Sequence, residues 1–256
     1  MKKTKKSLNN WDSPRLMNEK TPFAVRESFN QLRTNLMYTL TDIDSPPVYS
    51  VVSASENVGK STLIANLALS FAQIEKKVLL VDGDMRCPTL FRFFGLDPNH
   101  VGLSELISGI SSDVVVKNVR PNLNLITSGR IPPNPSELLS SPRFKELIEE
   151  WKKEYDIIFF DFPPIGVVAD ALSACQELTG YIFTIRSNHN HAKQISSALE
   201  SMERVGAKVA GIVLNDYNIK GHRNIYRSRY ATYDKYRYGQ VASESFSENE
   251  ATTHKK

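Results

Sequence analysis

The stretch Ser53-Ala-Ser-Glu-Asn-Val-Gly-Lys-Ser-Thr62 decides how this sequence folds. A β-rich run, Pro47 to Val52, precedes it, and a helical pattern from Lys60 to Ile74 follows it. In a strand–loop–helix of this kind, the backbone N–H groups of the loop and the helix N-terminus form a positive concavity that holds polyphosphate. Lys60 is expected to reach the β- and γ-phosphates, and the Ser61 hydroxyl to bind Mg²⁺. We interpret the stretch as a phosphate-binding loop.

The loop departs from the pattern G-x-x-x-x-G-K-[ST] in one place, because Ala54 stands where the first Gly is expected. Asn57 occupies a position where many such loops carry Gly, and Asn adopts left-handed backbone conformations more readily than most residues. The alternative interpretation is a chance Gly-Lys-Ser in an ordinary loop, which the flanking strand and helix disfavour.

Composition limits the class of protein. A chain of 256 residues with 41% hydrophobic content can bury one substantial core in one or two domains. No apolar run approaches the roughly 20 residues of a membrane span, and the basic start, Met1 to Lys6, is followed by polar residues and not by a signal core. Two cysteines, Cys87 and Cys175, suit a reducing compartment. These features predict a soluble, cytoplasmic protein.

The net charge of +4 is unevenly distributed. Residues 1–20 and 217–256 each carry a net charge of +4, so residues 21–216 carry −4. An acidic body argues against a broad nucleic-acid surface, whereas the basic ends could contact lipid, nucleic acid or the acidic body of another copy.

Strand-like and helix-like segments alternate along the body. Apolar strands are predicted at 77–82, 123–127, 155–161, 181–185 and 208–215, and helices at 102–108, 144–153 and 192–205. This alternation predicts an α/β fold of the P-loop NTPase type, a mostly parallel sheet with helices on both faces. Ligands of such sheets lie beyond the carboxyl ends of the strands.

Three regions are predicted. Residues 1–22 form a mobile basic arm, and residues 23–216 form the P-loop domain, whose first helix, at 24–40, caps the core or docks on another subunit. Residues 217–256 contain few large apolar residues other than tyrosine, so they are predicted to be a disordered tail.

Two strands of the body end in acids. Asp82 ends the strand at 77–82 and Asp84 follows it, and an octahedral Mg²⁺ bound to phosphate takes one or two carboxylates. The alternative is a pair of solvated aspartates with Arg86 as their salt-bridge partner. Asp161 closes the strand at 155–161 and resembles the Walker B carboxylate that holds Mg²⁺; its alternative role is to cap the next turn.

The tail holds six of the ten tyrosines. Tyrosines with no core of their own to enter are candidate phosphorylation substrates, and the interleaved Arg and Lys leave a nucleic-acid stacking arm as a competing interpretation. Phosphorylation of the five acceptors would add about −7.5 or more and reverse the tail's charge of +4. The five predicted acceptors are Tyr226, Tyr230, Tyr233, Tyr236 and Tyr238.

Together these motifs resemble those of the bacterial tyrosine kinases of capsular and exopolysaccharide synthesis. The match consists of Leu79 to Arg86, with the pattern D-x-D-x-R, Ile158 to Pro164, the stretch 128–139 and the tyrosine cluster. It extends from about Ala24 to Tyr238. The combination of D-x-D-x-R with a tyrosine tail is the specific part of the resemblance.

The resemblance implies an ATP- and Mg²⁺-dependent, non-specific protein-tyrosine kinase that phosphorylates its own tail, mostly in trans, and regulates polysaccharide synthesis and export. It implies catalytic roles for Lys60, Asp82, Asp84 and Asp161, with Asp82 as base for the tyrosine hydroxyl. Ser61, Asp84 and Asp161 are the implied metal ligands. The implied nucleotide contacts are Glu56, Asn57, Val58, Gly59, Lys60, Ser61, Thr62 and Asn215.

The resemblance also implies partners. These are protein substrates, other copies of the chain, and a separate membrane-spanning activator that recruits the protein to the inner face of the membrane; no nucleic acid is expected. The family's assembly motif E-x-x-R-x-x-R supplies Glu27 and Arg33 as oligomer contacts, but its first Arg is Asn30 here, which puts a ring-shaped oligomer in doubt. Cys87 and Phe162 also differ from the family pattern.

Two other functions share the fold. A partitioning or septum-positioning ATPase carries a signature Lys early in the loop, where this chain has Ala54, Ser55 and Glu56. A non-catalytic, nucleotide-gated adaptor of polysaccharide assembly would use the same residues to bind nucleotide without turnover.

Overall fold

A computed structural model describes residues 15–39 and 45–217 of the chain. The strands are β1 (Val48–Val52), β2 (Val78–Asp82), β3 (Val115–Arg120), β4 (Leu123–Ile126), β5 (Ile157–Asp161), β6 (Gly180–Arg186) and β7 (Val209–Asn215). The helices are α1 (Phe23–Tyr38), α2 (Lys60–Ala72), α3 (Leu90–Phe93), α4 (Leu103–Ile107), α5 (Pro135–Leu139), α6 (Pro142–Trp151), α7 (Asp170–Ser173) and α8 (Ala192–Arg204), with a 3₁₀ turn at Cys175–Glu177.

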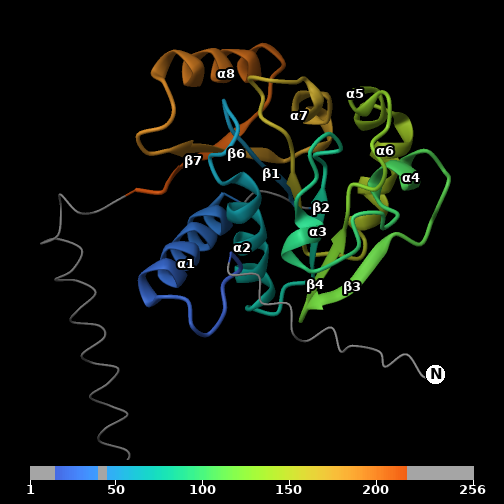
Figure 1. The fold of residues 1–256 in the computed structure, drawn as a ribbon, viewed down its shortest axis with the longest axis horizontal. Coiled ribbons are helices and arrows are strands. Elements are labelled where there is room, and N and C mark those ends of the chain that lie inside the picture. Colours follow the sequence, from blue (N-terminus) through green and yellow to red (C-terminus); the bar gives the residue numbers. More distant parts are fainter. Residues whose placement is uncertain (1–14, 40–44, 218–256) are drawn as a thin grey trace, which may run out of the picture. The chain divides into compact units, whose positions relative to one another are not determined.

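The strands form one seven-stranded sheet in the order β3-β4-β2-β5-β1-β6-β7 (Figure 1). All neighbouring pairs are parallel except β3 and β4. The central strands β1, β2 and β5 are buried at every position, which explains why their sequences are continuous apolar runs without alternation. The predicted fold class is confirmed.

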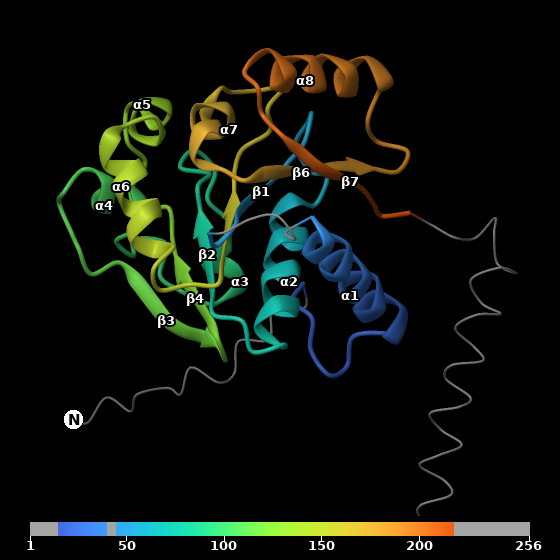
Figure 2. The ribbon, with the colours of Figure 1, turned by 180° about the vertical axis from the view of Figure 1, so that it is seen from behind.

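Helices cover both faces of the sheet (Figures 1 and 2). On one face α1, α2 and α3 pack on alternate strand residues such as Val51, Leu80 and Phe159. On the other face α4 to α8 pack on the intervening residues, such as Val81 and Phe160. The two-residue period of a strand thus divides one apolar run between two cores.

Strands β2 and β5 are paired in parallel so that Asp82 lies opposite Asp161. The carboxyl ends of parallel strands meet at one edge of a sheet, and α2 begins at that same edge, directly after β1. The two acidic strand ends and the phosphate loop therefore lie together, as the alternation of strands and helices predicted.

The edge strand β3 was not predicted. Asn118 interrupts its pattern with a left-handed backbone (φ 54°), and its pairing with β4 shifts register between Val116 and Arg120. A bulge of this kind breaks the alternation that reveals a strand in a sequence.

Part of the predicted mobile arm packs on the body. Leu16 is buried in the same apolar cluster as the residues of α2. The Asn66 side chain of α2 accepts a hydrogen bond from the Met17 amide (2.6 Å) and donates to the Arg15 carbonyl (2.9 Å). Residues 15–22 therefore belong with the folded body, while residues 1–14 lie outside the described part of the chain. Within the described residues, no helix is both long and apolar enough to span a bilayer.

We expect Asn66→Ala to release residues 15–22 from α2. The substitution removes the part-buried hydrogen bonds to the Met17 amide and the Arg15 carbonyl, so the free energy of unfolding should fall by about 1–3 kcal/mol. Hydrogen exchange at Met17 should accelerate. Asn134→Ala is the control, because the exposed Asn134 side chain donates to the exposed Glu137 (2.9 Å). Unchanged exchange at Met17 in Asn66→Ala would contradict the assignment.

Candidate nucleotide and metal site

The phosphate loop has the backbone that its sequence suggested. Asn57 (φ 58°) and Gly59 (φ 91°) are both left-handed, and α2 starts immediately afterwards at Lys60. A Cβ added at Gly59 would collide with the side-chain nitrogen of Asn215. The left-handed backbone therefore favours glycine at position 59, where any larger residue would also displace the Asn215 side chain, and Asn57 replaces a glycine without leaving the left-handed region.

Side chains from the end of β6 and the loop after it brace the phosphate loop. Arg186 donates to the carbonyl of Asn57 (3.0 Å), and Asn190 donates to the Ser55 hydroxyl (2.7 Å). His189 Nε2 lies 3.3 Å from the carbonyl of Glu56. These braces were not predicted from the sequence. The polar run Arg186 to His191, which follows a buried strand at the ligand edge, was the available signal.

Asn215, at the end of β7, holds the same loop by donating to the carbonyl of Val58 (2.7 Å). Together with Thr62 it also lines a cavity of about 590 Å³, whose other walls include Met17, Asn66 and Phe29. This volume lies within the range of small-molecule pockets. Of the remaining predicted nucleotide contacts, Glu56 is exposed on the loop and Val58 is buried.

Asp161 lies where the loop, β2 and β5 converge. It is buried, and the neighbouring Ser61 hydroxyl lowers its pKa. Burial raises the pKa of Asp161 to about 6. Lys60 and Ser61 lower this pKa, whereas the charge of Asp84 raises it further. Its Oδ1 atom is buried and accepts no hydrogen bond. A buried carboxylate oxygen without a donor favours a cation or an ordered water beside it.

These residues fit a magnesium site. Ser61, Asp84 and Asp161 offer a hydroxyl and two carboxylates, and Mg²⁺ in nucleotide sites takes its other ligands from phosphate and water. Residues 15–39 and 45–217 contain no group of three or more His, Cys, Asp or Glu side chains that could hold a metal by themselves. The site therefore suits a metal that arrives with a nucleotide, and not a resident structural ion.

Asp82 has a different environment. It is fully buried, and its Oδ2 atom accepts the backbone N–H groups of Thr89 (3.1 Å) and Leu90 (3.0 Å) while Oδ1 accepts that of Asp84 (3.3 Å). Burial and the neighbouring Asp161 raise the pKa of Asp82 well above its ordinary value. In this conformation Asp82 shapes the turn from β2 into α3, and a tyrosine hydroxyl cannot reach it without movement of that turn.

The alternative interpretation of the motif required a salt bridge from Arg86 to Asp82 or Asp84. The structure shows neither salt bridge. Its guanidinium forms two hydrogen bonds with the buried carboxylate of Asp170, at 2.7 and 3.0 Å. The alternative interpretation of D-x-D-x-R is therefore wrong about the partner of Arg86.

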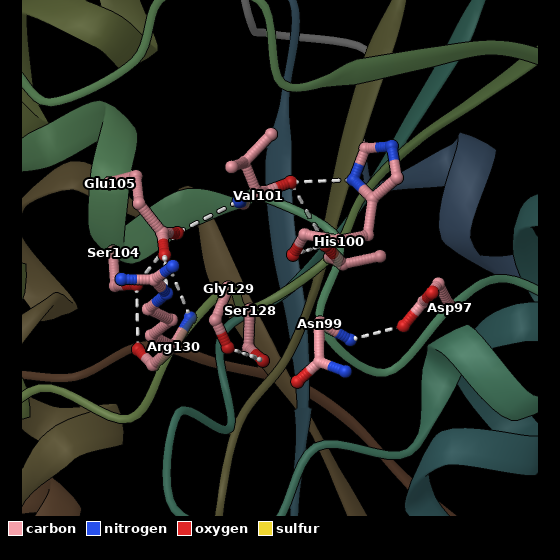
Figure 3. Close-up of polar contacts among 11 residues, drawn as sticks. Asp97, Asn99, His100, Val101, Ser104, Glu105, Ser128, Gly129 and Arg130 are labelled. Atoms are coloured by element: carbon pink, nitrogen blue, oxygen red, sulfur yellow. Dashed lines mark hydrogen bonds and ion pairs between the residues drawn. The ribbon is translucent and has the colours of Figure 1, made fainter.

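The segment 128–139, which resembles the kinase family, starts at the end of β4 beside β2. Figure 3 shows how the buried Glu105 of α4 fixes its beginning. Glu105 accepts the N–H groups of Gly102 (2.9 Å) and Arg130 (3.1 Å), and Ser104 donates its hydroxyl to the Arg130 carbonyl (2.7 Å). Burial raises the pKa of Glu105, but these N–H donors outweigh burial and the net shift is downward. Glu105 is thus an ionised structural anchor.

The two predicted oligomer contacts lie on α1. Arg33 donates to the carbonyl of Ser70 on α2 (2.5 Å), and burial lowers its pKa. Asn30, which replaces an Arg of the family motif, donates to Glu27 (3.2 Å). Arg33 thus helps to hold α1 on its own domain, and its role in assembly stays a prediction. The predicted phosphoacceptors, Tyr226 to Tyr238, lie outside the described residues.

Comparison with known proteins supports a nucleotide-binding domain. Residues 49–250 match the family "CobQ/CobB/MinD/ParA nucleotide binding domain". The chain is 37% identical to the putative tyrosine-protein kinase CapB of Staphylococcus aureus, over 84% of this chain and 94% of CapB. It is 39% identical to the tyrosine-protein kinase YwqD of Bacillus subtilis (strain 168), over 77% of this chain and 83% of YwqD.

A solved structure resembles the fold as well. The crystal structure of the chimerical protein CapA2B2 superposes with a TM-score of 0.71 at 36% identity, covering 77% of this chain and 86% of that chain. Sequence and structure comparisons therefore identify the same group of relatives.

The pKa of Asp161 predicts how stability depends on pH. A carboxyl with a folded-state pKa of about 6 holds its proton more tightly than in the unfolded chain, where the pKa is about 4. Its stabilising contribution is complete below about pH 4 and is lost as the pH rises to about 6. We expect Asp161→Asn, in metal-free buffer at pH 7, to be more stable than the wild type by roughly 1–3 kcal/mol.

Urea unfolding between pH 4.5 and 7.5 would measure this difference. Asp156→Asn is the control, because Asp156 is an exposed carboxylate of the same strand region. A difference between wild type and Asp161→Asn that does not grow with pH would contradict the argument.

Proposed function

The chain belongs to the bacterial tyrosine-protein kinases, and from this premise we propose that it transfers the γ-phosphoryl group of ATP to tyrosine hydroxyls, first of all those of its own C-terminal cluster. The kinase domain of this proposal comprises residues 23–216, and the acceptors lie in the tail 217–256. Protein tyrosines on other molecules are further substrates.

One observation carries the proposal: three separate segments meet at the buried carboxylate of Asp161. The Ser61 hydroxyl and the charges of Lys60 and Asp84 all act on the pKa of Asp161. Phosphoryl transfer needs little covalent chemistry from the protein and depends on positioning and on neutralisation of phosphate charge. A lysine, a hydroxyl and two carboxylates at one site are suited to that task.

Each residue has a distinct proposed role. The N–H groups from Glu56 to Thr62 cradle the phosphates, and Lys60 neutralises the β- and γ-phosphate oxygens. Ser61, Asp84 and Asp161 hold Mg²⁺, which, when bound, neutralises the charge that develops between the β- and γ-phosphates. Asn215 and Thr62 line the cavity that would take the nucleoside.

In the reaction, the tyrosine oxygen forms a bond to the γ-phosphorus and the bridging bond to ADP breaks. The hydroxyl proton passes to a carboxylate within hydrogen-bond reach, because the ordinary pKa of tyrosine, about 10, keeps it protonated at neutral pH. Asp82 is the proposed acceptor of this proton. That role requires the turn at Asp84–Leu90 to open and expose the Asp82 carboxylate, which it now covers.

The cellular part of the proposal follows the family resemblance. The kinase works at the inner face of the membrane with a separate membrane-spanning activator, and it regulates capsular or exopolysaccharide synthesis and export. Transfer occurs mostly between copies. Phosphorylation of the cluster reverses the tail's positive charge, so a tail attracted to an acidic body would be repelled after modification.

Incubation of the full chain with Mg-ATP, with and without the cytoplasmic segment of an activator, tests the proposal. We expect phosphate on Tyr226 to Tyr238, detected by mass spectrometry. Lys60→Met, or Asp82→Asn combined with Asp84→Asn, should lower the rate about 100-fold or more, because each removes charge that the transition state needs. Lys153→Met is the matched control, because Lys153 is exposed and precedes the amino end of β5, at the edge of the sheet opposite the phosphate loop.

Other outcomes would assign other functions. ATP hydrolysis with an unmodified tail would favour an ATPase of the partitioning type. Nucleotide binding without turnover would favour an adaptor.

A mixing experiment tests transfer between copies. One full chain carries Lys60→Met and keeps its tyrosines; the other has an intact loop and all five cluster tyrosines replaced by Phe. We expect phosphotyrosine on the Lys60→Met chain, formed at a rate that rises with the concentration of the second chain. An unmodified Lys60→Met chain in an active mixture would show that transfer is intramolecular.

A further inference from the structure

The carboxylate of Asp170 joins three segments that are distant in the sequence. It lies at the start of α7 and has no exposed surface. Its two oxygens accept hydrogen bonds from Nε and a terminal nitrogen of Arg86, at 2.7 and 3.0 Å. Oδ1 also accepts a hydrogen bond from the Ser136 hydroxyl of α5, at 2.5 Å. Burial by itself would raise the pKa of Asp170, but Arg86 and Ser136 outweigh it and the pKa is lowered. The pair is therefore ionised at neutral pH.

The other end of this link is Asp84. Its Oδ1 atom accepts the backbone N–H groups of Arg86 (3.3 Å) and Cys87 (2.9 Å). The amides of Arg86 and Cys87 orient the Asp84 carboxylate, and the Arg86 side chain binds Asp170. Asp170 is therefore linked to the residues that orient Asp84. A planar guanidinium with two parallel hydrogen bonds fixes orientation as well as distance, which a lysine ammonium does not do.

We propose that Asp170 is a positioning residue for magnesium: through Arg86 it holds the turn that aims the Asp84 carboxylate, and through Ser136 it connects that turn to the segment 128–139. The proposal rests on the magnesium role assigned to Asp84 above. Groups that orient a metal ligand typically change metal affinity by about 10–100-fold when they are replaced.

A purely structural role for Asp170 is the alternative, and the chain contains a control for it. Glu105 is another buried carboxylate, and it anchors the other end of the segment 128–139 without contacting the turn at residues 84–87. If Asp170 only anchors this segment, Glu105→Gln and Asp170→Asn should have similar effects on magnesium. If Asp170 acts through Arg86, only Asp170→Asn should affect magnesium.

The experiment measures binding and not turnover. A fluorescent ATP analogue is bound to the full chain, and Mg²⁺ is titrated into the wild type, Asp170→Asn, Arg86→Lys, the double variant and Glu105→Gln. We expect the half-saturating Mg²⁺ concentration to rise about tenfold or more in Asp170→Asn and in Arg86→Lys. The double variant should add little to either single change, because both break one link. Glu105→Gln should match the wild type in its Mg²⁺ dependence, and nucleotide binding in EDTA should be equal in all.

Several results would overturn the inference. One is a wild-type Mg²⁺ dependence in both Asp170→Asn and Arg86→Lys. Another is an equal shift in Glu105→Gln, and a third is additive shifts in the double variant. Arg86→Lys keeps the test decisive if Asp170→Asn does not fold, because the Arg86 side chain is 44% exposed and its replacement leaves the core intact.

The design separates this inference from the proposed kinase activity. If nucleotide binding by the wild type does not depend on Mg²⁺, both the proposed metal site and this inference are refuted. A wild type that requires Mg²⁺ but forms no phosphotyrosine would refute the kinase proposal, and the shifts in Asp170→Asn and Arg86→Lys would still support the positioning role.

Discussion

The structure depends on the parallel pairing of β2 with β5, which sets Asp82 opposite Asp161 at the edge where α2 begins. Two buried carboxylates at adjacent strand ends repel each other and lose hydration, so this arrangement costs stability unless partners compensate it. Here the partners come from two segments, the turn after β2 and the phosphate loop. Backbone N–H groups of the turn at 84–90 serve Asp82, whereas Ser61 and Lys60 serve Asp161. The groups that stabilise these two carboxylates are the same groups that form the candidate nucleotide site.

Much of this arrangement could be predicted from the sequence, because it follows from chain order and strand burial. Continuous apolar runs identified β2 and β5, the Gly-Lys-Ser stretch marked the start of α2, and the rule that parallel strands end at one edge brought Lys60, Asp84 and Asp161 together. The register between β2 and β5 could not be derived, although it decides which acids face each other. Register depends on the packing of both sheet faces, and no local pattern records it.

What escaped prediction consists of contacts between polar residues far apart in the chain. Arg86 had acidic neighbours in sequence, yet its partner is Asp170, 84 positions away. Arg186 and Asn190 brace a loop more than 125 positions earlier. Such pairs carry no periodicity, and a side chain near an acid in sequence need not be near it in space. The packing of Leu16 was missed for a related reason, since a single apolar residue in a polar arm gives no pattern.

Asp82 and Asp161 face each other but have different environments, which favour different roles. Asp82 is fully supplied with N–H donors, so a cation would gain little there, and its carboxylate becomes available only if the turn that donates to it moves. Asp161 keeps one buried oxygen without a donor, so a cation would relieve both its missing partner and its raised pKa. Asp84 lies on the turn that leads from Asp82 into α3, and its position is set by the amides of residues 86 and 87. A displacement of this turn would therefore uncover Asp82 and re-aim Asp84 in one movement, which couples the proposed proton acceptor to a proposed metal ligand through a single short segment of backbone.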